Sequence, residues 1–303
     1  MALTTVRPEG MGFNTGRRNL VINGAMQVAQ RGTSSAVTTS SGYFTADRFR
    51  TTVTSDSAGR HTQSQATITD LPGFANAIKL DCTTADTSIA AGELLVLATR
   101  FEGQDLQQLQ KGTSSAKSVT VSFYAKGTAK TYMCELTDFD NGRHNTQQFT
   151  VSTSWTRHSL TFVGDTTGTL DDDNALSLIL SFWLHAGSTY SGGTYTANTW
   201  ASTTTANRAA GIDSFFSSTD NELFITGIQM ELGENASDFE HRSFGEELAL
   251  CQRYCQVRSS EGVNYGVFAG GGLVDSNVAY FTIPHITTMR AAPSNSITGN
   301  FRV

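Results

Sequence analysis

The chain has 303 residues and a net charge of −6, with 38% hydrophobic and only 16% charged residues. This negative balance argues against a sequence-independent grip on nucleic acid, which requires basic surface to neutralise phosphates. Abundant Thr and Ser, 28 glycines and only 4 prolines are typical of an all-β protein with many turns, and not of a helical or disordered one.

The first segment, residues 1–18, is rich in glycine and has no hydrophobic period, so we interpret it as a tail or connector. It shows no charged-then-apolar signal segment, and we expect the protein not to use the usual export route. The ordered part then opens with NLVINGAMQVAQRG, Asn19 to Gly32, in which a short apolar run meets an Asn23-Gly24 step and a second run follows.

From residue 19 to residue 232 the sequence consists of short alternating segments separated by Gly, Asp, Asn and Ser. Residues 119–125 and 175–185 each place apolar side chains on one face and polar side chains on the other. That period of two is what a sheet packed on a single side requires. Further strands are predicted at 47–54, 61–69, 77–82, 93–102, 130–138, 147–152, 157–163 and 222–232.

About ten such strands, without a helix long enough to act as a crossover, predict an all-β antiparallel two-sheet sandwich or jelly roll. Gln104 to Gln110 is expected to form a short helical turn over the end of the sandwich. Ser188 to Gly211 is a long loop rich in Ser, Thr, Gly and Tyr, and such loops bind something or pack as Ω-loops. The apolar stretch Ala175–Ala186 is too short to span a bilayer, so we predict no membrane insertion.

The pattern changes after Gly233. Ser243 and Glu246 have the spacing of a capping box, and apolar residues recur at helical intervals up to Cys255. The acidic residues at the start of this segment also suit the positive end of a helix. We therefore predict a short amphipathic helix from Ser243 to Gln256.

Beyond this helix, strands are predicted at 264–269 and 278–284, and a final strand at 297–303 stops at the last residue. The small segment has too few residues for an independent core, which indicates a cut domain or an exchange with a neighbouring chain. The expected organisation is an N-terminal tail (1–18), a jelly-roll domain (19–237) and a short helix plus a small β segment (238–303) that contributes to an oligomer interface.

Signals for catalysis and metal binding are weak. Asp171–Asp173 lie in a turn, where adjacent carboxylates are usually solvated, and calcium binding is the alternative. We interpret Glu240-His241 as part of a charged junction between sandwich and helix, and not as an acid–base pair. No G-x-S-x-G elbow or P-loop occurs. We therefore predict no enzyme, no cofactor and no metal site.

The four cysteines are Cys82, Cys134, Cys251 and Cys255, and they form neither a CxxC pair nor a zinc-ligand spacing. Cys251 and Cys255 fall on one face of the predicted helix, where free cysteine behaves as a small buried hydrophobe. We therefore expect packing roles and assembly in a reducing cytoplasm.

Aromatic side chains give the most specific hypothesis about function. Trp183 and Tyr124 fall on the polar faces of their strands, and Trp200, Tyr190 and Tyr195 lie in the long loop. A flat ring flanked by Ser, Thr and Asn suits a sugar, whose C–H groups stack on the ring while its hydroxyls find hydrogen-bond partners. These five residues form the predicted carbohydrate-binding set. The alternative is that the long loop or a second subunit covers the rings.

The segment NLVINGAMQ resembles the first strand of jelly rolls of the carbohydrate-binding-module type. In that resemblance the Asn23-Gly24 step bends the strand so that it passes from one sheet edge to the other. Gly24 would supply the free φ angle that the bend needs.

A second resemblance, to a family of virion proteins of tailed bacteriophages, covers most of the chain. These proteins are generally described as tail fibre or host-recognition proteins, and many carry a further receptor-binding portion after the CQRY helix. In this chain only residues 257–303 occupy that place. The resemblance rests on GRRNLVINGAMQVAQRGTS (16–34), GYFTADRF (42–49), ITGIQMELG (225–233) and FEHRSFGEELALCQRYCQ (239–256).

This resemblance implies a structural protein of the virion, assembled in the host cytoplasm as a homotrimer, with a jelly-roll module that binds glycans. We expect the module to bind a host surface glycan or receptor as part of a tail fibre or short appendage. The tail, with Arg17 and Arg18 at its end, would attach to another virion structural protein. The alternatives are a head fibre or capsid-decoration protein, and a polysaccharide depolymerase whose carboxylates lie far apart in sequence.

Overall fold

The computed structural model describes residues 17–54, 57–258, 270–273 and 279–296. Its main body is the predicted antiparallel jelly-roll sandwich of two sheets. The six-stranded sheet contains, in spatial order, β1 (Arg50–Val53), β4 (Leu94–Glu102), β9 (Leu176–Ala186), β6 (Lys130–Asp138), β7 (Arg143–Val151) and β10 (Ala201–Ser202). The five-stranded sheet contains β2 (Arg60–Thr67), β3 (Asn76–Thr84), β11 (Glu222–Leu232), β5 (Val119–Gly127) and β8 (Thr156–Phe162).

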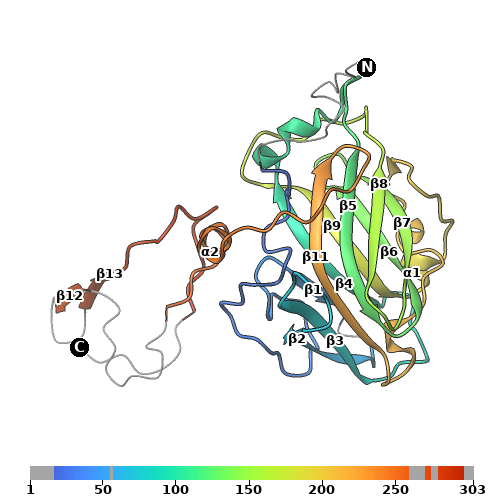
Figure 1. Cartoon of the computed structure of the whole chain (residues 1–303), viewed down its shortest axis with the longest axis horizontal. Helices are drawn as coiled ribbons and strands as arrows, with labels where there is room; N and C mark the ends of the chain where they lie inside the picture. Colours follow the sequence, from blue (N-terminus) through green and yellow to red (C-terminus); the bar gives the residue numbers. More distant parts are fainter. Residues whose placement is uncertain (1–16, 55–56, 259–269, 274–278, 297–303) are drawn as a thin grey trace, which may run out of the picture.

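The two sheets face each other, and the chain passes back and forth between them. Figure 1 shows β11 and β5 of one sheet in front of β4 and β9 of the other. Every strand predicted between residues 47 and 232 is present, and among the described strands of that region only the two-residue β10 was not predicted. Period-two alternation therefore located the sandwich strands.

The core between the sheets is rich in aromatic rings. Phe123 of β5 lies edge-on to Phe149 of β7 and Phe182 of β9, with ring centroids 4.9 and 5.0 Å apart. All three side chains are buried. Such edge-to-face pairs across the interior hold the two sheets in one register, since each ring fills the space left by the next.

The first predicted strand is wrong: the segment 19–32 forms a series of turns and contains no strand. Asn23 and Met26 adopt left-handed backbone conformations, with φ angles of 62° and 56°. The buried Asn23 amide donates to the carbonyls of Val28 (2.8 Å) and Asp47 (2.9 Å) and accepts from the Val28 amide (2.9 Å). These bonds from one side chain hold the turn in place where a strand would have paired its backbone along a ladder.

Gly24 is required for a different reason from the predicted one. A Cβ atom at Gly24 would lie 2.0 Å from the carbonyl oxygen of Ile228, so only glycine fits between the turn and β11. The Ile228 amide also donates to the Gly24 carbonyl at 3.0 Å. The Asn-Gly step is therefore a tight contact with β11 and not a bend in a strand.

Short helices complete the body. The turn predicted at 104–110 is present as two 3₁₀ turns, η2 (Gly103–Asp105) and η3 (Gln107–Leu109). The predicted helix at 243–256 is α2 (Phe244–Gln252), which is capped as expected by the Ser243 hydroxyl accepting from the Glu246 amide at 3.3 Å.

Helix α2 ends earlier than predicted because the chain turns back toward the sandwich after Gln252. Arg253 donates to the carboxylate of Glu102 at 2.8 and 2.6 Å, and the Tyr254 hydroxyl donates to the same group. This carboxylate at the end of β4 therefore fixes the segment that follows the helix.

Beyond α2, the described residues include a hairpin of β12 (Gly270–Leu273) and β13 (Ala279–Thr282), which Figure 1 shows away from the sandwich. Strand β13 matches the prediction at 278–284, whereas those at 264–269 and 297–303 fall outside the described residues. The boundary predicted at 237/238 stays a prediction. None of the described helices has both the length and the apolar character needed to cross a bilayer.

The four cysteines are free, and Cys82, Cys134 and Cys251 are buried while Cys255 is half-buried. Burial raises the pKa of the Cys82 thiol to about 11, so it stays protonated and unreactive at neutral pH. The packing role predicted for Cys251 is confirmed.

Candidate functional site

The outer face of the six-stranded sheet is covered by the long segment between β9 and β11. This segment contains α1 (Ser188–Ser191), β10 and η4 (Thr205–Asn207). It encloses a second hydrophobic cluster outside the main core, so it packs as a closed loop. The buried members are Leu94, Val96, Ala98, Met133, Trp183 and Ala209, with Ile179, Ala186, Tyr190, Tyr195 and Ile212 packed against them.

A buried charge network fastens this loop to the sheet. Glu135 of β6 is 0% exposed and accepts from Trp183 Nε1 (2.7 Å), His144 Nδ1 (3.0 Å) and Arg208 Nε and Nη2 (both 2.8 Å). Burial acts to raise the pKa of Glu135, but the Arg208 charge and these hydrogen bonds outweigh it and hold the pKa at about 2. Glu135 is therefore ionised, and its bidentate bond to Arg208 anchors the loop.

Trp183 was predicted to bind carbohydrate because its ring was expected to be exposed, and the structure instead buries that ring. The side chain is only 2% exposed, with Tyr190 at 5.3 Å between ring centroids and the Arg208 guanidinium 4.8 Å from the ring. Its strand face was assigned correctly, but the loop covers that face. No sugar can reach the ring while the loop is closed.

The three predicted loop residues also serve the loop itself. Trp200 is half-buried against the core, and its indole donates to the Val163 carbonyl at 2.7 Å. The Tyr195 hydroxyl accepts from the Gln148 amide at 3.0 Å, and Tyr190 packs on Trp183. These residues hold the loop on the sheet and do not meet on an open surface.

The outer face of the five-stranded sheet carries a cluster of aromatic rings, of which Tyr124 is the member predicted from sequence. Tyr124 lies 5.3 Å from Phe74, and Phe74 lies 5.1 Å from Phe239 and 5.3 Å from His241, between ring centroids. The first three side chains are half-buried and His241 is exposed. The rings come from a strand and two loops, and they form a continuous aromatic surface.

A β-bulge makes room for this cluster. Gly227 lies where the pairing of β11 with β5 shifts between Thr226 and Gln229, and it has a left-handed φ of 62°. A Cβ atom there would lie 2.8 Å from Phe74 Cζ and 2.9 Å from Tyr124. A glycine is therefore needed both for the backbone and for the rings above it.

A second aromatic pair with fixed charges lies on the same face. Trp155 and Phe224 lie 6.3 Å apart, and Lys126 Nζ lies 5.1 and 4.9 Å from their rings. Asp70 accepts from Trp155 Nε1 at 2.9 Å and from Lys126 Nζ at 2.5 Å, and these bonds lower the pKa of Asp70. Lys79 approaches Phe224 to 5.2 Å from the other side. Flat rings thus alternate with donors and acceptors of hydrogen bonds.

Sequence reasoning missed most of this surface, which we call the aromatic face (Phe74, Tyr124, Trp155, Phe224 and Phe239). Phe224 could have been found, because it alternates with the inward-facing Leu223 and Ile225 on β11. Trp155 and Phe74 lie in connections between strands, where no periodicity places a side chain. Their positions follow only from strand pairing.

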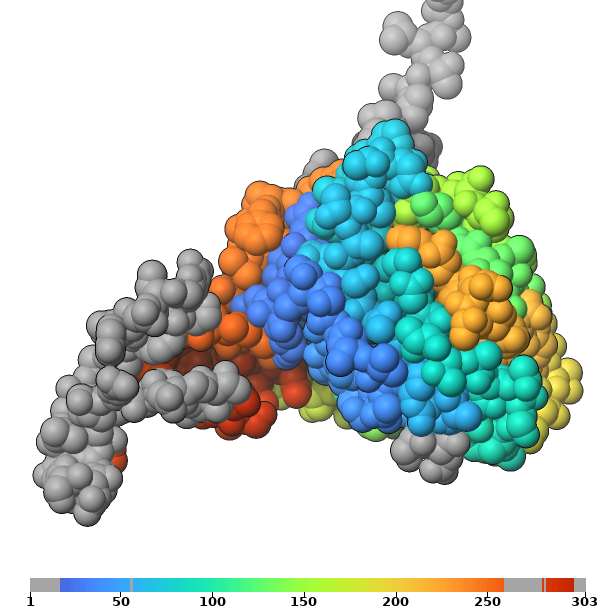
Figure 2. Space-filling model, turned by 90° about the horizontal axis from the view of Figure 1, so that it is seen from below, coloured from blue at the N-terminus to red at the C-terminus, as the bar shows by residue number. Residues whose placement is uncertain are grey.

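The junction predicted around Glu240 is confirmed. Glu240 accepts from the backbone amides of Arg18 (3.1 Å) and Asn19 (2.7 Å), and Glu247 accepts from the Asn23 amide at 2.6 Å. Figure 2 shows the blue N-terminal segment packed beside the orange segment that contains α2. The carboxylate of Glu240 is thus occupied by structural hydrogen bonds, which supports a junction and not an acid–base pair.

Arg242 completes this junction by donating to the Val21 carbonyl at 3.1 Å and to Glu247 at 3.2 Å. The sequence blocks that begin at residues 16 and 239 therefore meet in one hydrogen-bonded node. Arg17 forms an exposed ion pair with Glu246 at 2.6 Å on the same side. The role predicted for Arg17 and Arg18 in virion attachment stays a prediction.

The acidic turn at Asp171–Asp173 forms hydrogen bonds of its own, and the calcium alternative stays a prediction. Asp173 closes its own turn by accepting from the Ala175 amide at 2.8 Å, and Asp171 uses its amide to donate to Asp140 at 3.0 Å. Within the described ranges, no three His, Cys, Asp or Glu side chains are grouped so that they could hold a metal ion.

Comparison with known proteins finds similarity only in structure. No protein-family model and no curated protein sequence matches the chain. A family 4 carbohydrate-binding module matches with 9% identity over 70% of this chain and 98% of its own, at a TM-score of 0.36. A family 61 module solved with β-1,4-galactotriose matches with 8% identity over 72% and 100%, at 0.36. The family 11 module of a Clostridium thermocellum cellulase matches with 12% identity over 66% and 97%, at 0.33.

Proposed function

We propose that this chain is a structural component of a tailed-phage virion, a tail fibre or short appendage, that attaches to host surface glycans through its aromatic face. The observation behind this proposal is that half-buried aromatic rings lie among charged hydrogen-bonding groups on the outer face of the five-stranded sheet. The segment between β9 and β11 covers the outer face of the six-stranded sheet. Sugar C–H groups stack on such rings, while hydroxyls bond to the groups between them.

The carboxylates on this face favour binding over catalysis. A glycosidase acid requires a raised pKa and a second carboxylate at a set distance. Here the pKa of Asp70 is lowered by Lys126 and Trp155, and Lys79 lies 2.8 Å from Asp81 and 3.1 Å from Glu222. Asp70, Asp81 and Glu222 are thus each paired with a lysine, and we propose a binding protein that is not an enzyme.

The virion part of the proposal rests on the sequence blocks that resemble those of phage appendage proteins. These blocks meet in the node around Glu240 and Glu247, so they behave as one structural unit. A homotrimer is supported by apolar side chains that stay exposed after α2 in the single chain. They include Val257 (46%), Tyr280 (69%), Ile283 (49%) and Ile286 (55%). We expect a partner chain to cover them and the N-terminal tail to reach another virion protein.

The test is attachment of the purified chain to host cells and to immobilised host polysaccharide. We expect the Tyr124→Ala, Trp155→Ala double variant to bind more weakly by about 1–3 kcal/mol per site, because each stacking ring contributes about 0.5–1.5 kcal/mol. Phe139→Ala is the matched control, because Phe139 is 60% exposed but lies in the β6–β7 turn, outside the aromatic face.

Three results would contradict the proposal. Full attachment by the folded double variant would reject the aromatic face as the binding surface. Release of sugar from host polysaccharide would reject the non-enzymatic role. If a gold-labelled antibody failed to mark intact phage, the virion role would be rejected. Label on the head would instead favour the alternative of a capsid-decoration protein over a tail appendage.

A further inference from the structure

A cavity of 1040 Å³ lies between the sandwich and the segments that follow α2. Its walls come from the loop before β1, the end of β4, residues 251–258 and residues 283–296. The outer wall is tied to the body, since the Arg290 amide donates to the Arg253 carbonyl at 2.9 Å and Asn174 donates to the Arg290 carbonyl at 2.6 Å. The cavity is therefore built by contacts among segments far apart in sequence.

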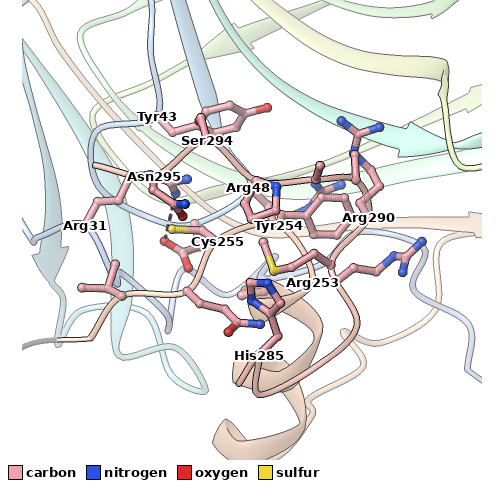
Figure 3. Close-up of a pocket in the computed structure, with 18 of the residues that line it drawn as sticks. Arg31, Tyr43, Arg48, Arg253, Tyr254, Cys255, His285, Arg290, Ser294 and Asn295 are labelled. Carbon is pink, nitrogen blue, oxygen red and sulfur yellow. Dashed lines mark ion pairs between the residues drawn. The ribbon is translucent and has the colours of Figure 1, made fainter. Parts of the chain in front are cut away.

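Positive charge gathers in this cavity although the chain has a net charge of −6. Its described lining includes Arg31, Arg48, Arg100, Arg253, Arg258 and Arg290, against only two carboxylates, Asp47 and Glu102. Figure 3 shows Arg48 against the ring of Tyr254, with Arg31, Arg253 and Arg290 around the same space.

Both carboxylates already have partners. Glu102 holds Arg253 and Tyr254, as described above. Asp47 accepts from the Gln30 side chain at 2.5 Å and lies 3.6 Å from Arg31. Among the described residues, no carboxylate lies within ion-pair distance of Arg48 or Arg100. The same holds for Arg258 and Arg290, which donate only to backbone carbonyls, so four of the six guanidinium groups have no counter-ion among the described residues.

Arg48 is the most deeply buried of these four arginines. It is only 7% exposed, its backbone has a left-handed φ of 76°, and its guanidinium carbon lies 3.4 Å from the centre of the Tyr254 ring. It donates from one terminal nitrogen to the Arg100 carbonyl, while its Nε has no partner in the described residues. A buried cation with an unused donor is costly unless an anion approaches it. Strained backbone of this kind gathers at binding sites.

We propose that this cavity binds an acidic saccharide, with the carboxylate or sulfate of the sugar on Arg48 and Arg100. A guanidinium presents several N–H donors in a planar fork that matches an oxyanion, and Tyr254 holds the Arg48 fork in place. The cavity is far larger than one inorganic anion needs, and Tyr43, Ser294 and Asn295 line it with groups that hydrogen-bond sugar hydroxyls. The site is separate from the aromatic face and does not depend on it.

The test is calorimetric titration of the full-length chain with trigalacturonate, a sulfated trisaccharide, neutral galactotriose and sodium sulfate. We expect at least one acidic saccharide to bind, galactotriose not to bind, and sodium sulfate to bind at least about tenfold more weakly. Binding should weaken as sodium chloride is raised, because the interaction is ionic.

Two variants and one control locate the binding. Arg48→Gln and Arg100→Gln should each lower affinity about tenfold or more, because each removes a charge-assisted bond. Lys117→Gln removes one exposed positive charge outside the cavity and should leave affinity unchanged. If Arg48→Gln does not fold, as checked by circular dichroism, the half-buried Arg100→Gln decides the outcome.

Several results would overturn this site. They are no binding of either acidic saccharide, equal binding of galactotriose, sodium sulfate binding as tightly as the saccharide, or affinity unchanged in the folded arginine variants. The Tyr124→Ala, Trp155→Ala variant should keep this binding at full strength. Failure of the aromatic face and failure of this cavity can therefore be told apart.

Discussion

The outer faces of the two sheets differ although the strands beneath them follow the same alternating pattern. On the six-stranded sheet, the outward-facing Trp183 is buried beneath the segment between β9 and β11. On the five-stranded sheet, Tyr124 and Phe224 keep part of their rings open. Alternation thus predicts the direction of a side chain, but the covering segment decides whether that side chain meets solvent.

The electrostatics of the two faces differ in the same way. The Glu135–Arg208 pair is shielded beneath the loop, where removal of one partner leaves a charge without compensation. The pair of Lys126 with Asp70 on the aromatic face is open to solvent, which screens the attraction between the two charges. We therefore expect the covered face to contribute to stability and the open face to binding.

The strongest test of this contrast is Glu135→Gln. The neutral amide leaves Arg208 without its counter-charge beneath the loop, and we expect the free energy of unfolding to fall by about 3–5 kcal/mol. Urea denaturation measures this loss, and red-shifted tryptophan emission would report water reaching Trp183. The matched control on the open face, Glu222→Gln, should cost less than about 1 kcal/mol. Equal losses in the two variants would contradict the contrast.

Acid should weaken the side of the five-stranded sheet before the covered network. Burial lowers the pKa of His61 on β2 from 6.5 to about 4, because the ring is fully buried and its nitrogens have no partner in the described residues. Between pH 6.5 and 4, His61 is therefore protonated in the unfolded chain and neutral in the folded chain. The resulting stability is present above pH 6.5 and is lost as pH falls toward 4, by about 3 kcal/mol.

Urea denaturation at several pH values between 7 and 4 measures this loss. His61→Leu should reduce the pH dependence, although not to zero, because burial also lowers the pKa values of His158 and His185. The exposed His241→Leu is the control and should leave the dependence unchanged. Glu135, with a pKa of about 2, stays ionised throughout this range. An identical pH profile in His61→Leu would rule out this assignment.

Gly227→Ala tests how the open face is built. We expect a loss of about 1–3 kcal/mol, because alanine disfavours the left-handed backbone and its Cβ atom would lie 2.8 Å from Phe74. Glycan binding should fall as well, since Phe74 and Tyr124 must move. Gly245→Ala in α2 is the control, because its Cβ meets nothing within 4 Å and should be neutral or stabilising. Thermal melting separates the two variants.

The smallest expected effects distinguish the tryptophans of the two sides. Trp155→Ala should lower attachment by about 0.5–1.5 kcal/mol and leave thermal stability nearly unchanged. Trp200→Ala should do the reverse, because its ring packs on the core and its indole holds the Val163 carbonyl at 2.7 Å. If Trp200→Ala abolished attachment while Trp155→Ala left it unchanged, the long loop and not the aromatic face would be the binding region.

Local sequence patterns predicted much of the secondary structure. Alternation located the main strands, and the capping pair of Ser243 and Glu246 located the start of α2. The pattern failed at Asn19–Gly32, because the side chain of Asn23 satisfies the backbone that a strand would have paired. It also failed at the end of α2, where Arg253 binds Glu102, a residue far away in sequence, and the helix ends at Gln252.

The sequence by itself determined where most of the sandwich strands lie and, away from the bulges, toward which side a side chain points, because both depend on neighbours along the chain. Only the tertiary structure decided that Arg208 closes a loop over Trp183, that Phe74 and Trp155 join Tyr124, and that Arg48 lines a cavity. Those outcomes depend on contacts between segments separated by tens to hundreds of residues. Burial and charge pairing arise from such contacts, and no local period encodes them.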